Sequence, residues 1–220
     1  DKKNVRFIFH LSQPRSLEDY VQESGRGGRD GEACSCVIFF RFADRIFHLR
    51  NIAQIASKVV RENKLQLLNH MSQFCTDNSG CRVQKIAKYF GEDQGNYCCV
   101  CDICQNGVVS EMKDFTKEAK NIVNCLASLT AISPIVRTSE LAMTYVGSMS
   151  KGITTKGFHV VPLYGSGKTV FKNTLSVTNF VHHLIFNGMI AENLPSQESR
   201  VVSTNLTPGT VTDIKVMYSM

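Results

Sequence analysis

Four cysteines are spaced so that they could bind one metal ion. Cys98, Cys101 and Cys104 follow a C-x2-C-x2-C pattern, and Cys81 lies 17 residues upstream of the first of them. One tight loop with this spacing can point three thiolates at one centre, and a fourth thiolate completes the tetrahedral set that suits a structural Zn²⁺. Iron–sulfur ligation is the competing prediction, although the spacing is less typical of it. Cys99 is out of phase with this pattern and is left out of the predicted zinc site.

A second group of chemically active side chains lies in the glycine-rich segment Gln22–Glu32. Arg26 and Arg29 are three positions apart, in a turn made pliable by Gly25, Gly27, Gly28 and Gly31. Guanidinium groups offer paired donors to phosphate oxygens, and glycines let a backbone approach a ligand closely. The pattern predicts a phosphate-reading loop or an arginine finger, with a solvated glycine-rich turn as the alternative.

A third segment, "YGSGKT" at residues 164–169, ends like a nucleotide-binding loop. The full pattern needs a glycine five positions before Gly167, where this chain has Pro162, which lacks an N–H. We therefore expect no ATP here. The segment is expected to lead into the third helix of this region, so its N–H groups would face phosphate at the positive helix end. On that basis the predicted contacts to the DNA backbone are made by Gly165, Ser166, Gly167 and Lys168, and Lys172 is predicted to extend this basic surface, although scattered lysines are usually just solvated.

The composition is that of a folded protein. Of the 220 residues, 43% are hydrophobic and 20% are charged, which is enough apolar material to bury a core. The net charge of +6 favours a polyanionic partner. The sequence has no signal peptide and no apolar run of membrane-spanning length, so we expect a soluble, non-secreted protein without membrane association. In a reducing compartment, clustered thiols are expected to bind metal rather than form disulfides.

Residues 1–45 have the pattern of the end of an α/β unit. Two β-rich runs, Val5–Leu11 and Cys36–Phe42, flank a helix predicted over Ser16–Glu23 with Ser16 as its N-cap. A domain rarely begins with its own central strand. The chain is therefore expected to be a segment of a longer protein.

Residues 46–108 change to a helical periodicity. One or two amphipathic helices are expected to run toward Cys75, and another over Arg82–Phe90 is expected to stop at Gly91. These helices would carry the predicted zinc site.

Residues 109–220 show three helix signals and then two strands. The helices are expected to start near Thr116 and Ser139 and to include the apolar stripe Val177–Ile185, and the strands are Met189–Asn193 and Arg200–Thr204. Three helices followed by a hairpin is the element order of a winged helix.

These motifs resemble those of a known family. "SLEDYVQESGRGGRDGE" (16–32) is similar to the last conserved motif of superfamily 2 helicases in the form used by RecQ DNA helicases, although Val21 stands where an aromatic residue is common. "CRVQKIAKYFGE" (81–92) and "CCVCDIC" (98–104) resemble the RecQ zinc-binding module, and the third block resembles the RecQ winged helix. The form of the first motif leans toward the eukaryotic, Bloom-type branch.

The resemblance implies a fold that combines α/β and α+β parts. Residues 1–45 would be the C-terminal edge of the second RecA-like helicase lobe, residues 46–108 the helical, four-cysteine zinc-binding module, and residues 109–220 an RQC-type winged helix that binds DNA. The hairpin Glu192–Arg200 would be a strand-separating wing, although its tip has no aromatic residue to stack on a base pair.

The resemblance also implies a function, that of a 3′-to-5′ ATP-dependent DNA helicase that acts in the nucleus in DNA repair, recombination and replication. Its DNA partners would be duplexes and single-strand junctions such as forks. Arg29 would be the arginine finger that reaches the γ-phosphate of ATP, Arg26 its partner, and Gln22 a residue that couples nucleotide state to lobe closure.

ATP and Mg²⁺ would be bound mainly by an upstream lobe, because no complete Walker A or acidic Walker B motif occurs in this chain. The chain alone is therefore expected to be inactive as an ATPase. Two alternatives remain open: a non-catalytic, zinc-stabilised DNA-binding module, and a zinc-dependent protein-interaction adaptor.

Overall fold

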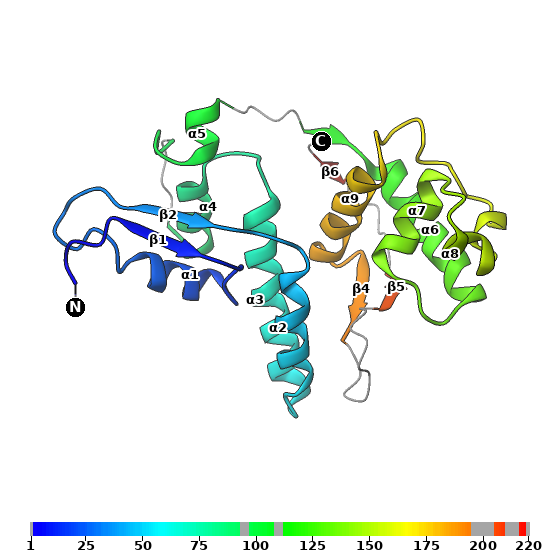
Figure 1. Ribbon diagram of the computed structural model, residues 1–220, viewed down its shortest axis with the longest axis horizontal. Coiled ribbons are helices and arrows are strands. Elements are labelled where there is room, and N and C mark those ends of the chain that lie inside the picture. The colour runs from blue at the N-terminus through cyan, green and yellow to red at the C-terminus, as the bar shows by residue number, and fades with distance from the viewer. Residues whose placement is uncertain (1, 93–96, 108–111, 195–204, 210–215, 219–220) are drawn as a thin grey trace. The chain divides into compact units, whose positions relative to one another are not determined.

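The computed structural model describes residues 2–92, 97–107, 112–194, 205–209 and 216–218 (Figure 1). The chain divides into two compact units, Asp1–Val109 and Ser110–Met220, and each unit is described by itself. Among the described residues, none of the helices combines the length and the apolar character needed to cross a membrane. The finer division of the first unit near residue 45 stays a prediction.

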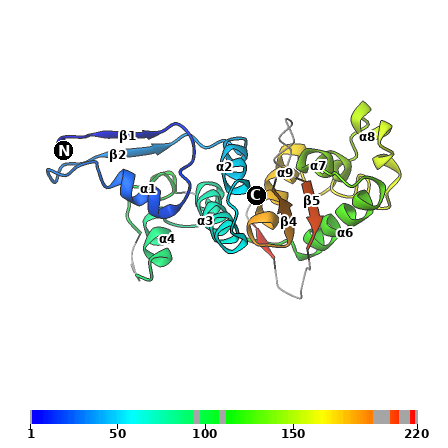
Figure 2. The same ribbon diagram turned by 90° about the horizontal axis from the view of Figure 1, so that it is seen from below.

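The first unit begins with a β-α-β arrangement. Strand β1 (Phe7–His10) and strand β2 (Ser35–Ile38) pair in parallel, with Phe7 opposite Ser35 and His10 opposite Ile38. Helix α1 (Leu17–Ser24) connects them and lies along one face of the pair (Figures 1 and 2). The N-cap prediction is confirmed, because Ser16 Oγ accepts a hydrogen bond from Asp19 N at 3.1 Å. Strand β2 is shorter than expected, since it ends at Ile38.

The opposite face of this two-stranded sheet carries exposed aromatic side chains. Phe7 is 64% exposed and Phe9 is 56% exposed, and their rings stack with centroids 6.1 Å apart. Val37 on the neighbouring strand and Phe39, directly after that strand, are also exposed. Because parallel sheets are normally covered on both faces, this face of the sheet is incomplete within the described residues.

Among the described residues of the first unit, four further helices follow: α2 (Asp44–Ala53), α3 (Lys58–Thr76), α4 (Arg82–Tyr89) and α5 (Asp102–Asn106). The predicted helical stretch before Cys75 is thus two helices, which pack side by side (Figure 2). Helix α4 ends as predicted, with Gly91 in the left-handed region at φ 81°. Helix α1 packs on α3 through a small apolar cluster of Leu17, Met71 and Phe74.

The second unit is mainly helical, with two short antiparallel strand pairs. Its elements are β3 (Lys113–Asp114), α6 (Thr116–Ile132), α7 (Thr138–Val146), α8 (Lys151–Thr155), the 3₁₀ helix η1 (Phe158–Val160), α9 (Thr174–Phe186), β4 (Ile190–Asn193), β5 (Asn205–Pro208) and β6 (Met217–Tyr218). Strand β4 pairs with β5, and β3 pairs with β6.

The core of the second unit follows the predicted helix faces. The predicted stripes of α6 and α9 are buried, with Leu126 and Phe180 both at 0% exposure. Helices α6, α7 and α9 followed by the β4–β5 hairpin keep the predicted winged-helix order, with α8 and η1 added between the second and third helices. The predicted strand Arg200–Thr204 and the tip of the predicted wing lie outside the described residues.

Candidate functional site

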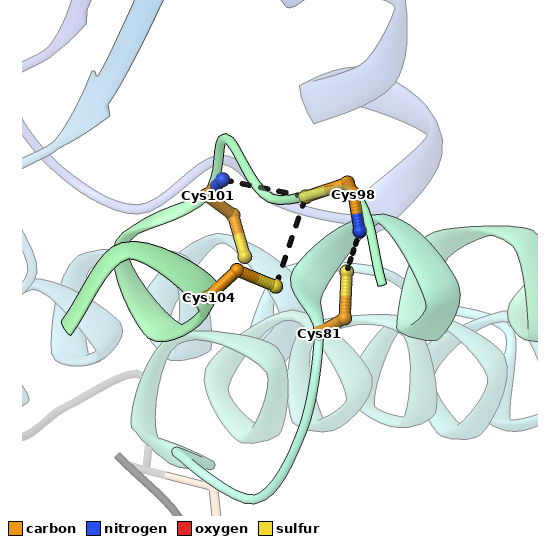
Figure 3. Close-up of side chains that lie close together, drawn as sticks. All are labelled: Cys81, Cys98, Cys101 and Cys104. Atoms are coloured by element: carbon orange, nitrogen blue, oxygen red, sulfur yellow. Dashed lines mark hydrogen bonds between the residues drawn. The ribbon is translucent and has the colours of Figure 1, made fainter. Parts of the chain in front are cut away.

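The four predicted metal ligands come together in the first unit. Cys81 is the N-cap of α4, Cys101 is the N-cap of α5, Cys104 lies within α5, and Cys98 lies in the loop before it. Their sulfur atoms all lie within 4.8 Å of one another, and Figure 3 shows the side chains pointing toward a common centre. In a regular zinc tetrahedron with Zn–S bonds of about 2.3 Å, the sulfurs would be about 3.8 Å apart. The donor set therefore fits Zn²⁺.

Backbone N–H groups favour the thiolate form within this cluster. Cys98 N donates to Cys81 Sγ at 3.5 Å, and Cys101 N donates to Cys98 Sγ at 3.3 Å. Burial opposes ionisation of Cys81, but the N–H groups of Cys98 and Gln84, together with the thiols of Cys98 and Cys104, outweigh it and lower the pKa of this thiol to about 6. Burial and the neighbouring thiols raise the pKa of Cys104 to about 12. Without a metal ion, the four thiols cannot all ionise easily, because the negative charges repel one another. A divalent cation bound between the sulfurs would stabilise all four thiolates at once.

Cys99 lies outside the cluster, as its phase in the sequence predicts. Its side chain is exposed, and its Sγ lies 3.6 Å from the carbonyl oxygen of Tyr97. Its backbone is left-handed, with φ at 59°, a conformation that few residues other than glycine adopt. The turn at Cys99 lets the chain reverse between Cys98 and Cys101.

An ion pair beside the cluster was not singled out by the sequence analysis. Arg82 donates two hydrogen bonds to the carboxylate of Asp102, at 2.6 and 2.8 Å, and a third to Phe74 O at 2.7 Å. The only feature of the sequence that links these two residues is that each directly follows a cysteine of the cluster: Arg82 follows Cys81, and Asp102 follows Cys101. The structure alone shows that the two side chains meet.

The connection between α1 and β2, residues 25–34, is called the arginine loop here. Gly27 and Gly28 pack closely against Cys34 and Glu32, and the pliability of the loop stays a prediction. A Cβ on Gly27 would lie 2.2 Å from Cys34 Sγ, and a Cβ on Gly28 would lie 2.5 Å from Glu32 O. Gly28 also has φ at 62°, and its N–H donates to Val5 O at 3.0 Å. The loop is therefore tightly packed at Gly27 and Gly28, whereas the space around Gly31 is open.

The three predicted ATP-facing residues are exposed on this part of the chain. Gln22 lies on α1, Arg26 directly follows the C-cap residue of that helix, and Arg29 lies in the arginine loop. The neighbouring Asp30 forms a two-bond ion pair with Arg6, at 3.0 and 2.6 Å. The arginine loop thus presents the two arginines at the surface of the unit.

The "YGSGKT" segment does not begin a helix, so this part of the prediction is wrong. Gly165 N donates to Thr144 O at 3.0 Å, Gly167 N donates to Tyr145 O at 2.8 Å, and Ser166 N donates to Leu163 O. Helix α9 begins later, at Thr174, capped by Asn173. The N–H groups proposed to hold phosphate are therefore already bonded within the protein.

The glycines of this segment allow it to pack closely against the end of α7. A Cβ on Gly167 would lie 2.4 Å from Tyr145 Cδ1, and a Cβ on Gly147 would lie 3.0 Å from Gly165 Cα. This close approach to the end of α7 requires small residues. Lys168 and Lys172 are exposed, and their contact with DNA stays a prediction.

Comparison with known proteins identifies two domains. The family model described as RecQ zinc-binding matches residues 43–105, a span that contains all four clustered cysteines. The model described as the RQC domain matches residues 109–209, which form most of the second unit.

Full-length relatives match most of the chain. The ATP-dependent DNA helicase hus2/rqh1 of Schizosaccharomyces pombe is 30% identical over 97% of this chain and 16% of its own length. The ATP-dependent helicase SGS1 of Saccharomyces cerevisiae is 34% identical over 84% of this chain and 13% of its own length. The ATP-dependent DNA helicase RecQ of Bacillus subtilis is 30% identical over 86% of this chain and 31% of its own length.

The chain therefore spans less than a third of each of these relatives. The relatives come from a bacterium and from eukaryotes at similar identity, so the Bloom-type branch stays a prediction.

Proposed function

The chain belongs to the RecQ family of DNA helicases, and we propose that it serves as the C-terminal ATPase-completing and DNA-binding part of a 3′-to-5′ ATP-dependent helicase. The observation that carries this proposal is the arginine loop, whose two exposed arginines belong to the same compact unit as the zinc-binding region. The proposed setting is the nucleus, where the enzyme would act on forks and single-strand junctions during repair, recombination and replication.

The position of the arginine loop supports action on a nucleotide held by another lobe. The loop lies at the amino ends of the strands, because Gly28 bonds to Val5 before β1 and the loop leads directly into β2. Ligands of open α/β sheets bind outside the carboxyl ends of the strands. Arg26 and Arg29 thus lie away from the usual ligand position of their own sheet. In the proposed enzyme, Arg29 stabilises charge on the γ-phosphate and Arg26 assists it.

The exposed sheet face supports assignment of residues 1–45 to the edge of a RecA-like lobe. Phe7, Phe9 and Phe39 leave one face of a parallel pair uncovered, whereas such sheets are normally buried on both faces. Further strands and helices of the same lobe would cover these rings.

The cysteine cluster supports a structural role for zinc. We propose Cys81, Cys98, Cys101 and Cys104 as its ligands, because four sulfurs leave no open position for substrate or water. A bound zinc ion would join α4 to the loop before α5 and so stabilise this region. Iron–sulfur chemistry stays the less favoured alternative.

The test uses the full-length protein that contains this chain. DNA-stimulated ATP hydrolysis and unwinding are measured on partial duplexes with either a 3′ or a 5′ tail. Arg29→Ala should abolish ATP turnover and keep DNA binding, since an arginine finger is worth about 10³–10⁵ in turnover. The matched control is Arg15→Ala, which removes another exposed arginine from the same segment.

Substantial residual ATP turnover in Arg29→Ala would refute the finger role. Salt-sensitive DNA binding by a full-length protein without ATP turnover would favour the non-catalytic module instead.

A further inference from the structure

A buried polar cluster lies between α2, α3 and the segment that leads into α1. Its centre is Arg45 on α2, which is 0% exposed. Arg45 Nη1 donates to Ser72 Oγ at 2.9 Å and to Leu68 O at 3.5 Å, and Nη2 donates to Asn69 Oδ1. A buried guanidinium is costly unless its donors are bonded, so these contacts fix how α2 and α3 pack.

The cluster continues to Gln13, which is 1% exposed. Ser72 Oγ lies 3.1 Å from Gln13 Oε1, and His48 Nε2 donates to Gln13 O at 3.0 Å. Burial lowers the pKa of His48, so its ring is neutral at physiological pH and donates through Nε2. Gln13 is thus held through both its side chain and its backbone. We refer to Gln13, Arg45, His48, Asn69 and Ser72 as the Arg45 cluster.

Gln13 lies three residues before Ser16, the N-cap of α1. Helix α1 has eight residues, and a helix this short depends on tertiary contacts for its position. Besides the apolar cluster of Leu17, Met71 and Phe74, a hydrogen bond from Tyr89 OH to Glu18 Oε1 at 2.7 Å anchors α1 to the zinc-binding region. The Arg45 cluster therefore holds the chain at the point where it enters α1.

The same helix carries Gln22 and runs directly into the arginine loop. A shift at its start moves its end, because a helix is a stiff element. Hydrogen bonds are directional, so the bonds to Gln13 Oε1 and Gln13 O specify one placement of this residue more tightly than apolar packing would, while its buried Nε2 has no partner among the described residues.

We propose that Gln13, Ser72 and Arg45 are positioning residues that set the location of the arginine loop relative to the zinc-binding helices. This inference rests on the proposed function, in which Arg29 acts on the γ-phosphate of ATP. The cluster touches neither nucleotide nor DNA, and it acts through α1.

The test compares Gln13→Leu and Ser72→Ala in the full-length enzyme. Gln13→Leu removes the side-chain contact to Ser72 and keeps the bond from His48 to the backbone. Both variants should lower kcat for ATP about 10-fold or more, because small displacements of catalytic groups are that costly. The KM for ATP and the affinity for DNA should stay within about twofold, because the arginine acts in the transition state.

The matched control is Leu49→Ala, which empties a buried apolar position on the same helix as Arg45. It should lower the unfolding temperature at least as much as Gln13→Leu does and leave kcat nearly unchanged. Amide hydrogen exchange over residues 17–31 should become faster in Gln13→Leu and Ser72→Ala but not in Leu49→Ala. If one cluster variant fails to fold, the other provides the test.

Full ATP turnover in both folded cluster variants, or an equal loss in Leu49→Ala, would overturn the proposal. Arg29→Ala is assayed in parallel. If Arg29→Ala abolishes turnover while the cluster variants keep it, only this inference fails. If Arg29→Ala keeps turnover, the proposed function fails and the inference fails with it.

Discussion

Arg82 and Asp102 form an ion pair with two hydrogen bonds, at 2.6 and 2.8 Å. This ion pair joins the start of the helix after Cys81 to the start of the helix after Cys101. Arg82 is the first residue of α4 and follows Cys81, and Asp102 is the first residue of α5 and follows Cys101. The Arg82 side chain is only 19% exposed, and its guanidinium lies 5.4 Å from the centre of the Phe74 ring. This arrangement orients both helix starts toward one metal position.

Replacing the carboxylate should weaken metal binding without removing a ligand. We expect Asp102→Asn to lower zinc affinity about 10- to 100-fold, the usual effect of losing a group that orients metal ligands. Competition with a chelator of known zinc affinity measures this change. The control is Asp30→Asn, which alters another carboxylate that accepts two bonds from an arginine but is remote in sequence from the cysteines. Equal affinity in Asp102→Asn and the unaltered protein would contradict the orienting role.

Removing one ligand should release the metal. Cys101→Ser should reduce bound zinc from about one ion per chain to a small fraction, and it should lower the unfolding temperature, because metal binding and folding are coupled. Atomic absorption and thermal unfolding measure the two effects. The control is the neighbouring Cys99→Ser, because Cys99 is exposed and outside the cluster. Zinc loss in Cys99→Ser, or full zinc content in Cys101→Ser, would show that the ligand set is wrong.

Gly167 should be required for the packing of α7. Gly167→Ala places a methyl group 2.4 Å from Tyr145 Cδ1, and Tyr145 is buried. Overpacking of this kind should lower the free energy of unfolding by about 1–3 kcal/mol. Chemical denaturation of the chain measures it, with Gly152→Ala as the control because no atom lies within 4 Å of its added Cβ. An unchanged free energy of unfolding in Gly167→Ala would contradict this prediction, because it would show that the segment can shift to accommodate the added methyl group.

Lys168 should contribute to DNA binding through its side chain alone. Because it is exposed, Lys168→Glu should leave the unfolding temperature unchanged. It should weaken duplex binding uniformly across sequences and make binding less dependent on salt. Fluorescence anisotropy at several salt concentrations measures both, with Lys58→Glu as a charge-matched control outside the second unit. Identical binding by the Lys168 variant would exclude this residue from the DNA surface.

The contact between Tyr89 and Glu18 should make stability fall at alkaline pH. Burial and the hydrogen bond to Glu18 raise the pKa of Tyr89 to about 12, whereas an unfolded tyrosine ionises at about 10. Between these values only the unfolded chain has lost the phenolic proton, so the free energy of unfolding decreases as pH rises from about 10 to about 12. Tyr89→Phe should show a shallower decrease in urea denaturation. Tyr164→Phe is the control, and equal slopes in both variants would argue against this role.

Much of the local structure could be predicted from the sequence. Ser16 caps α1, Gly91 ends α4, and the apolar stripe on α9 is buried, because each signal lies within a few positions of its effect. The zinc ligands could be selected for the same reason, since three of them lie within seven residues and Cys99 is out of phase. The arginine pair was identified by its spacing, although the packed state of its loop was not.

By itself, the sequence determined the caps, the helix faces, the ligand spacing and the family resemblance. Tertiary structure alone decided where the N–H groups of Gly165 and Gly167 donate, because their acceptors belong to α7 and lie about twenty positions away in the chain. It also decided that Arg45 is buried, which nothing in its neighbourhood predicts. Its partners Leu68, Asn69 and Ser72 on α3 are distant in the chain, and a buried charge is stable only where such partners converge.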